Sequence, residues 1–199
     1  MANLHFHYGT MNCGKSGRIC DTAFSLRASK KQVEVIKPAF DNRDSESEVV
    51  SRNGKRIPAL SLTSFENYEP HPKTKVILVD EVQFFSPADI DILVRIADQK
   101  KKIVMCYGLL VDSNEQMFPA SKRLLEVGAK PHQMATTCQV NGCMKLATHH
   151  LRFDKAGRGR RVVRQGEQCV VGDDVYMSVC RAHYDRFYYG CAKKTRGGR

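Results

Sequence analysis

Apolar residues recur along the first 110 positions in two patterns that alternate. Residues 15–29 and 87–100 place apolar side chains at helical spacing. Four shorter apolar runs have the length and composition of buried strands: residues 4–8, 32–36, 76–79 and 103–107. Strands that alternate with helices indicate an α/β fold, with a mostly parallel sheet flanked by helices and right-handed crossovers. We therefore predict an α/β domain at residues 1–134.

The pattern changes after residue 134. The rest of the chain carries cysteine pairs, charged turns and short strand-like runs, and a helical pattern returns only at Arg181. We predict a smaller second domain at residues 135–191 and a flexible basic tail at residues 192–199.

Composition limits the class of protein. The chain has 199 residues and a formal charge of +11, so anionic partners are favoured by electrostatic steering. We find no secretory signal and no apolar run long enough to cross a bilayer, so no membrane partner is expected. The eight cysteines are then expected in a reducing cytoplasm, where metal binding is more common than disulfides.

A phosphate-binding motif joins the first strand to the first helix. The segment matches G-x-x-x-x-G-K-[ST] at every fixed position: Gly9, Thr10, Met11, Asn12, Cys13, Gly14, Lys15 and Ser16. Glycines let backbone N–H groups curl around phosphate oxygens, while the helix presents its positive end. Lys15 adds charge near the outer phosphates, and Ser16 offers a hydroxyl to Mg²⁺. The strand before and the helix after argue against a chance glycine-rich turn. We predict a P-loop for ATP with Mg²⁺, in which Cys13 is a small filler.

Two acids follow the apolar run at residues 76–79. Asp80 ends a Walker B-like strand and is predicted to reach Mg²⁺. Glu81 could remove the proton from an acceptor hydroxyl, as a kinase requires, or activate water, as many ATPases do. Position alone leaves these two alternatives about even, and the non-functional alternative is that Glu81 caps the next turn or pairs with a lysine.

The second domain contains residues with the spacing of a metal site. A Cys₃His set fills all four positions of a tetrahedral zinc site and leaves none for water, so the metal is predicted to be structural: Cys138, Cys143, Cys180 and His183. The C-x₄-C spacing is wider than the usual C-x₂-C, and four unrelated residues are the alternative. His149 and His150 rank below His183 as ligands.

These motifs occur in one order over residues 3–185, and together the chain resembles the cellular-type (type II) thymidine kinases. Besides the P-loop and the late cysteines, several segments carry the resemblance: Asp80-Glu81-x-Gln83-Phe84, Cys106-Tyr107-Gly108-Leu109, Lys37-Pro38-x-x-Asp41-x-Arg43, Val50-Ser51-Arg52-x-Gly54, Gly166-Glu167-Gln168 and Cys180-Arg181-x-His183-Tyr184.

The resemblance implies roles for individual residues. Glu81 is the catalytic base that takes the proton from a 5′-hydroxyl, and Ser16 and Asp80 serve Mg²⁺. The ATP and phosphate site also includes Asp41, Arg43, Val82 and Gln83. The nucleoside is bound by a closing loop and an apolar wall: Met11, Leu109, Phe118, Val170, Val171, Gly172, Asp173 and Tyr176. Core packing remains the alternative for Met11 and Phe118. The resemblance further implies a structural Zn²⁺ that supports this loop, and a homotetramer.

The implied function is ATP-dependent phosphorylation of thymidine to dTMP with release of ADP, and deoxyuridine is the second substrate considered. One alternative is a nucleic-acid-stimulated P-loop ATPase whose zinc ribbon and basic segments, residues 158–161 and 193–196, bind DNA or RNA. Aromatic residues do not interleave with those charges, so no nucleic-acid partner is expected. Another alternative is a binding protein that has lost turnover. It draws on two departures from the family, Ser113 in place of an aromatic residue and a shortened loop around Gly172.

Overall fold

The computed structural model describes residues 3–41, 45, 47–154, 161–164 and 175–190. Its centre is a six-stranded sheet of order β5-β2-β6-β7-β1-β8, in which every neighbouring pair is parallel. The predicted α/β fold is confirmed. The strands of this sheet are β1 (Leu4–Gly9), β2 (Gln32–Pro38), β5 (Leu60–Leu62), β6 (Thr74–Val79), β7 (Ile103–Gly108) and β8 (Lys130–Met134).

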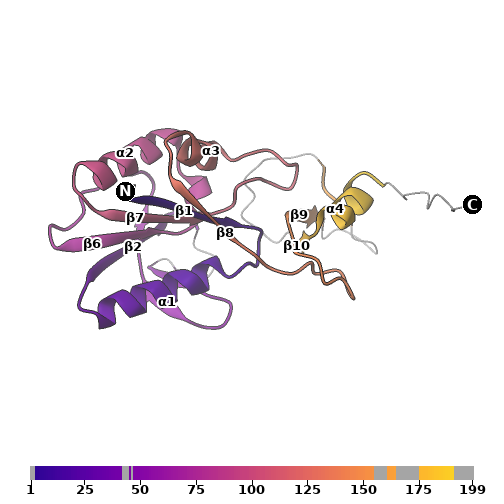
Figure 1. Cartoon of the computed structure of the whole chain (residues 1–199), viewed down its shortest axis with the longest axis horizontal. Coiled ribbons are helices and arrows are strands. Elements are labelled where there is room, and N and C mark those ends of the chain that lie inside the picture. The colour runs from indigo at the N-terminus through magenta and orange to yellow at the C-terminus, as the bar shows by residue number, and fades with distance from the viewer. Residues whose placement is uncertain (1–2, 42–44, 46, 155–160, 165–174, 191–199) are drawn as a thin grey trace, which may run out of the picture.

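Helices cover both faces of the sheet (Figure 1). α1 (Lys15–Ala28) packs on one face, beside an antiparallel hairpin of β3 (Glu48–Val50) and β4 (Arg56–Pro58). α2 (Pro87–Asp98) and α3 (Pro119–Glu126) pack on the other face. Among the described residues, no helix combines the length and the apolar character needed to cross a membrane.

The two cores follow from the alternation of side chains along the strands. In β6, Val76 and Leu78 point to the core under α1, whereas Ile77 and Val79 point to the core under α2. Successive strand residues face opposite sides, so a strand buried on both faces reads as a continuous apolar run. This is why the sequence pattern predicted the central strands.

Histidine and tyrosine rings stack along β1, on the face of the sheet that α1 covers. The His7 ring lies between those of Tyr107 and His132, at centroid distances of 4.6 and 4.5 Å, and His5 Nδ1 lies 3.1 Å from His132 Nε2. Burial lowers the pKa of His7 most, and together with the charges of His132, His5 and Arg18 it brings the pKa to about 4. The His7 ring is therefore neutral at pH 7.

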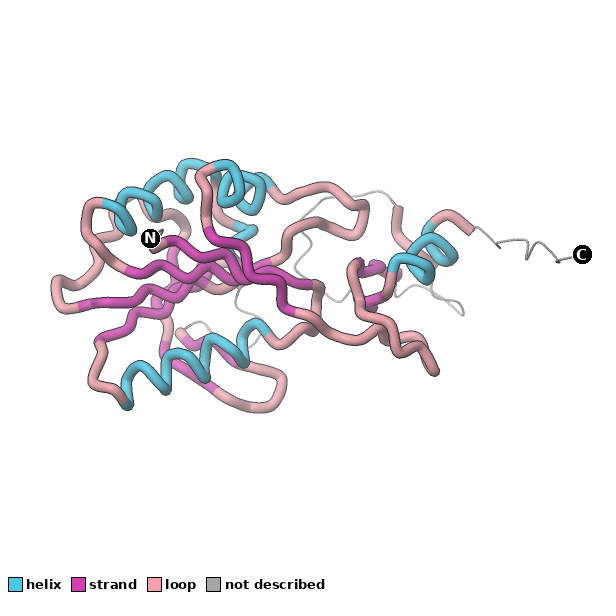
Figure 2. The backbone as a smooth tube through the Cα atoms, in the orientation of Figure 1, coloured by secondary structure: helices cyan, strands magenta, loops and turns pink. Residues whose placement is uncertain are grey.

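The C-terminal unit lies beyond the end of the sheet where β1 leads into the P-loop (Figure 2). It contains the antiparallel pair β9 (His149–Phe153) and β10 (Val175–Val179), followed by α4 (Arg181–Tyr188). Leu151 and Tyr184 are almost fully buried in a small core of its own. The domain limits stay predictions, and the tail at 192–199 lies outside the described residues.

Candidate active site and metal cluster

The site forms where three neighbouring strands end. β1, β7 and β6 are adjacent and parallel, so the segments that follow Gly9, Gly108 and Val79 meet at one edge of the sheet. Ligands of open parallel sheets bind at this edge. A cleft of about 810 Å³ opens here, and residues of the P-loop, the acidic pair and the C-terminal unit line it.

The P-loop has the geometry of an anion site. Gly14 adopts a left-handed conformation (φ 84°) just before α1, so the helix begins with its N-terminus toward the cleft. The Lys15 side chain is buried, and its Nζ donates to the Thr10 carbonyl at 3.0 Å. Two buried oxygens, Thr10 Oγ1 and Asn12 Oδ1, have no hydrogen-bond partner among the described residues. Buried polar atoms without partners are rare. The Lys15 charge, the N-terminus of α1 and the Thr10 hydroxyl, which can donate, fit a phosphate ligand, whereas Asn12 Oδ1 can only accept a hydrogen bond.

Ser16 and Asp80 bring two oxygen ligands together. Ser16 Oγ donates to Asp80 Oδ2 at 3.1 Å, across 64 positions of the sequence. Burial raises the pKa of Asp80 to about 7, and the neighbouring Glu81 contributes to the same rise. Hydroxyl and carboxylate oxygens are the ligands that Mg²⁺ prefers, so this pair fits the ion.

Glu81 lies beside Asp80 in a constrained conformation. Its backbone φ is 45°, a value that residues other than glycine rarely adopt. Its N–H donates to Asp80 Oδ1 at 2.9 Å. In the short helix η1 (Val82–Phe84), the buried Gln83 donates through Nε2 to Glu81 Oε2 at 2.6 Å. Gln83 Oε1 accepts the N–H of Leu109 at 3.0 Å. One amide thus joins the Glu81 carboxylate, after β6, to the backbone of Leu109, after the neighbouring strand β7.

Four described residues expected around a nucleoside base line this cleft: Met11, Leu109, Phe118 and Tyr176. Leu109 and Phe118 are buried, so they form the wall of the cleft and are part of the packed interior as well. The β9 residue His150 also lines the cleft, at 6.0 Å from the Tyr176 ring centroid. Burial lowers the pKa of His150 to about 3, and its ring is neutral.

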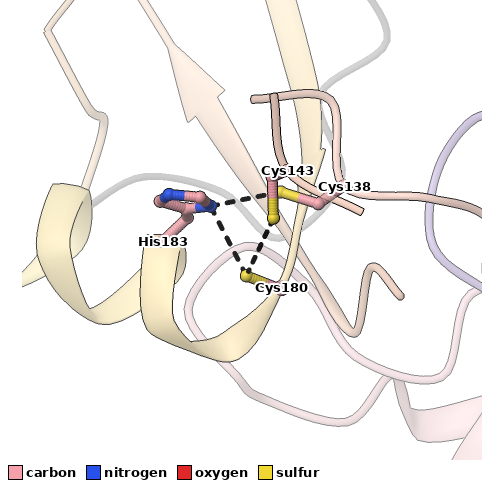
Figure 3. Close-up of side chains that lie close together, drawn as sticks. All are labelled: Cys138, Cys143, Cys180 and His183. Carbon is pink, nitrogen blue, oxygen red and sulfur yellow. Dashed lines mark hydrogen bonds between the residues drawn. The ribbon is translucent and has the colours of Figure 1, made fainter. Parts of the chain in front are cut away.

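The predicted metal ligands converge in the C-terminal unit (Figure 3). The ligand atoms of the four residues all lie within 4.8 Å of one another. Cys143 Sγ and Cys180 Sγ are 3.9 Å apart, and Cys138 Sγ is 3.3 Å from His183 Nδ1. A tetrahedral zinc site with Zn–S bonds of about 2.3 Å requires S···S separations of roughly 3.8 Å. The cluster is therefore consistent with a structural zinc site.

The Cys138 thiol is predisposed to ionise. Burial opposes this, but hydrogen bonds from the backbone of Cys180 and Val140 and from His183 lower the pKa of Cys138 to about 7. A thiolate is the form that binds metal. His149 and His150, ranked as weaker candidates, are not members of the cluster.

The comparison with known proteins agrees with this geometry. The family profile described as "Thymidine kinase" matches residues 2–184. The chain belongs to the thymidine kinase family. It is 36% identical to the thymidine kinase of Enterobacteria phage T4, with 93% of this chain and 96% of the relative covered. It is 33% identical to the thymidine kinase of Idiomarina loihiensis and 34% identical to that of Haemophilus influenzae, with 92% of this chain and 96% of each relative covered.

Most of the site residues predicted from the sequence line this cleft. Besides the four wall residues, they are Asn12, Cys13, Gly14, Lys15, Ser16, Asp41, Asp80, Glu81 and Gln83. Gly9, Thr10 and Val82 do not line it, and the Val82 side chain is buried in the core under α2. Arg43, Val170, Val171, Gly172 and Asp173 lie outside the described residues.

Sequence reasoning missed several residues that line the cleft of this thymidine kinase family member. They include Asp112, Asn114, His150 and Arg152, whereas Ser113, singled out as a departure from the family, does line the cleft. Asp112 and Asn114 follow β7, directly after the Cys106-Tyr107-Gly108-Leu109 segment, and their place next to that motif was the available signal. His150 and Arg152 come from β9, and no local pattern reveals that β9 packs against the P-loop end of the sheet.

Proposed function

We propose that this chain transfers the γ-phosphoryl group of ATP to the 5′-hydroxyl of thymidine, giving dTMP and ADP. The observation that carries the proposal is that Lys15 and Glu81, which are 66 positions apart, line the same cleft. A phosphate cradle and a carboxylate on one cavity provide a place for the donor and for the acceptor alcohol. Deoxyuridine, which differs by one methyl group, is the second substrate proposed, because such a difference changes binding by only about 1–3 kcal/mol.

In this proposal the P-loop binds the triphosphate and Lys15 neutralises charge on its outer phosphates. Glu81 accepts the proton of the 5′-hydroxyl as that oxygen forms a bond to the γ-phosphorus. The bond from the γ-phosphorus to the bridging oxygen breaks, and ADP leaves with the electron pair. Phe118 and Tyr176 bound the nucleoside end, where a closed cleft keeps water away from the phosphoryl group.

Two metals accompany this function in the proposal. Ser16 and Asp80 would hold Mg²⁺, which supplies charge neutralisation for the transferred phosphoryl group. The cluster of three cysteines and His183 would hold one structural Zn²⁺. Homotetramer assembly and a cytoplasmic location complete the proposal, supported by the family resemblance and by cysteine usage. Sedimentation at assay concentration and cell fractionation test these two points.

The decisive experiment measures ADP release with thymidine, deoxyuridine, deoxycytidine, deoxyadenosine or single-stranded DNA, in wild type and in Glu81→Gln. We expect stimulation by thymidine in wild type. In Glu81→Gln we expect kcat to fall by about 10²–10⁴, the contribution of a general base, while ATP binding by calorimetry is retained. Glu66→Gln, an exposed acid outside the cleft, is the matched control and should behave as wild type.

Each outcome is informative. Near-normal kcat in Glu81→Gln refutes the base assignment. Stimulation by DNA alone would establish the rival function, a nucleic-acid-dependent ATPase, and no stimulation by any of them would indicate a protein that has lost turnover.

A further inference from the structure

The loop between β7 and α3 is fastened to the C-terminal unit. We call residues 109–118 the wall loop, because it contributes Leu109, Ser113 and Phe118 to the cleft. The buried hydroxyl of Tyr184 donates to the Ser113 carbonyl at 2.8 Å. The Tyr188 hydroxyl donates to Asn114 Oδ1 at 3.0 Å. Two side chains of α4 therefore fix the part of the wall loop that faces the nucleoside end.

Glu115 is the most heavily bonded residue of this contact. Its Oε1 accepts from Arg181 Nη1 at 2.5 Å and lies 3.1 Å from His149 Nε2, while its Oε2 accepts from the Tyr189 hydroxyl at 3.1 Å. The Glu115 side chain is 27% exposed, compared with 58% for Arg181. One carboxylate thus joins the wall loop to β9, to the first residue of α4 and to the residue just after α4.

The backbone of Glu115 is strained. Its φ is 63°, in the left-handed region that glycine adopts without cost. A residue in such a conformation costs on the order of 1–3 kcal/mol and persists where the surroundings determine it. The three contacts of the carboxylate hold Glu115 in this conformation. A glycine at position 115 would adopt the conformation without strain but would lose all three contacts.

α4 connects this contact to the metal cluster. Cys180 caps the start of α4 and His183 lies in its first turn, so both belong to the cluster. Arg181, Tyr184 and Tyr188 are spaced three and four residues apart and share the helix face that contacts the wall loop. Whatever fixes Cys180 and His183 therefore also fixes the side chains that hold the wall loop.

The wall loop transmits this restraint as a unit. The Asp112 carboxylate accepts the N–H groups of Asn114 and Gln116 at 2.8 and 2.9 Å, and the Asp112 N–H donates to the Gln116 carbonyl. A displacement at Glu115 therefore moves the neighbouring residues that line the cleft. We propose that Glu115 is a positioning residue, through which the C-terminal unit holds the wall loop at the nucleoside end of the cleft. This inference rests on the proposed nucleoside kinase activity.

The test compares Glu115→Gly with wild type. Glycine removes the carboxylate and relieves the strained φ, so the variant should unfold within a few degrees of wild type. We expect the KM for thymidine to rise about tenfold, with the KM for ATP and the kcat within twofold of wild type. Calorimetric titration with thymidine should show the same loss of affinity. Glu115→Gln, which keeps one carbonyl acceptor, should recover part of the affinity, and Glu126→Gln, an acid on α3 away from this contact, should have no effect.

A second pair of variants separates positioning from a general loss of structure. Arg181→Gln should raise the thymidine KM, and in the double variant with Glu115→Gly the effects should be less than additive, because both remove one contact. If wild type phosphorylates thymidine but neither single variant raises the thymidine KM, the positioning role of Glu115 is refuted and the kinase assignment stands. Equal increases in the KM for thymidine and for ATP also refute it. If wild type phosphorylates no nucleoside, both proposals fall.

Discussion

Replacing Gln83 by leucine tests whether this buried amide orients the Glu81 carboxylate. The variant keeps nearly the same volume, so the core around η1 is not emptied. It loses the 2.6 Å hydrogen bond from Nε2 to Glu81 Oε2, and it leaves the buried N–H of Leu109 without its acceptor. Gly108 shows how tightly the amide is held, because a Cβ there would lie 2.5 Å from Gln83 Oε1.

The magnitudes follow from these two contacts. A hydrogen bond to a charged group contributes about 1.5–3 kcal/mol, and a buried N–H without a partner costs about 1–3 kcal/mol. We therefore expect the free energy of unfolding to fall by about 2.5–6 kcal/mol, the sum of the two contributions. If Glu81 is the base, its less constrained carboxylate should lower kcat by about ten- to a hundredfold, which is part of the 10²–10⁴ that a general base contributes. The KM for ATP should stay within twofold, because the P-loop contacts are unchanged.

The assay combines urea unfolding with coupled ADP release, and Ser121→Ala is the matched control. Ser121 Oγ donates to the carbonyl of Leu109 at 2.6 Å and is fully buried, so this variant loses a hydrogen bond to the same residue without touching Glu81. Its stability should fall by about 1 kcal/mol, with kcat unchanged. A Gln83→Leu variant that is destabilised but turns over at the wild-type rate would refute the orienting role.

Two further predictions concern the metal and the histidine stack. Elemental analysis should find one zinc per chain. Removing the zinc with a chelator should lower the melting temperature of the C-terminal unit. Metal-free protein with an unchanged melting temperature would exclude the structural role. His7 has a pKa of about 4 in the folded chain against 6.5 as its ordinary value, so unfolding takes up a proton and stability falls as the pH drops from about 6.5 toward 4. His7→Phe keeps a ring between Tyr107 and His132 but cannot titrate. Between pH 7 and pH 5, urea unfolding should show a smaller loss of stability for this variant than for wild type. Equal losses of stability in the two proteins would contradict the role of His7.

The central strands and the first two helices could be predicted because their patterns are local. The predicted helix at 15–29 and the observed α1 differ by one residue at the end, and the strand at 76–79 gained two residues at its start. α3 and β8 were missed. α3 has only eight residues and few apolar ones, and β8 contains Pro131 and no apolar alternation. β8 is a strand because it pairs with β1, and this contact is remote in sequence.

In the site, too, features that depend on local sequence could be predicted and features that depend on remote contacts could not. The P-loop and the acidic pair could be located from motifs, since each motif consists of consecutive residues. The position of Gln83 between Glu81 and Leu109 could not, because it depends on how η1 packs against the end of β7. The contacts of Glu115 with Arg181 and Tyr189 join positions 66 and 74 residues apart, and no sequence spacing encodes them.

The strand at the outer edge of the sheet has a consequence for handling the protein. In the part of the chain that the structure describes, β8 pairs with β1 alone, and the backbone groups on its other side lie at the edge of the sheet. Pro131, the second residue of β8, has no N–H to offer, and the exposed Lys130 beside it carries charge. Replacing these two residues by valine and threonine should leave the cleft unchanged, yet should make concentrated samples prone to aggregation through added strands.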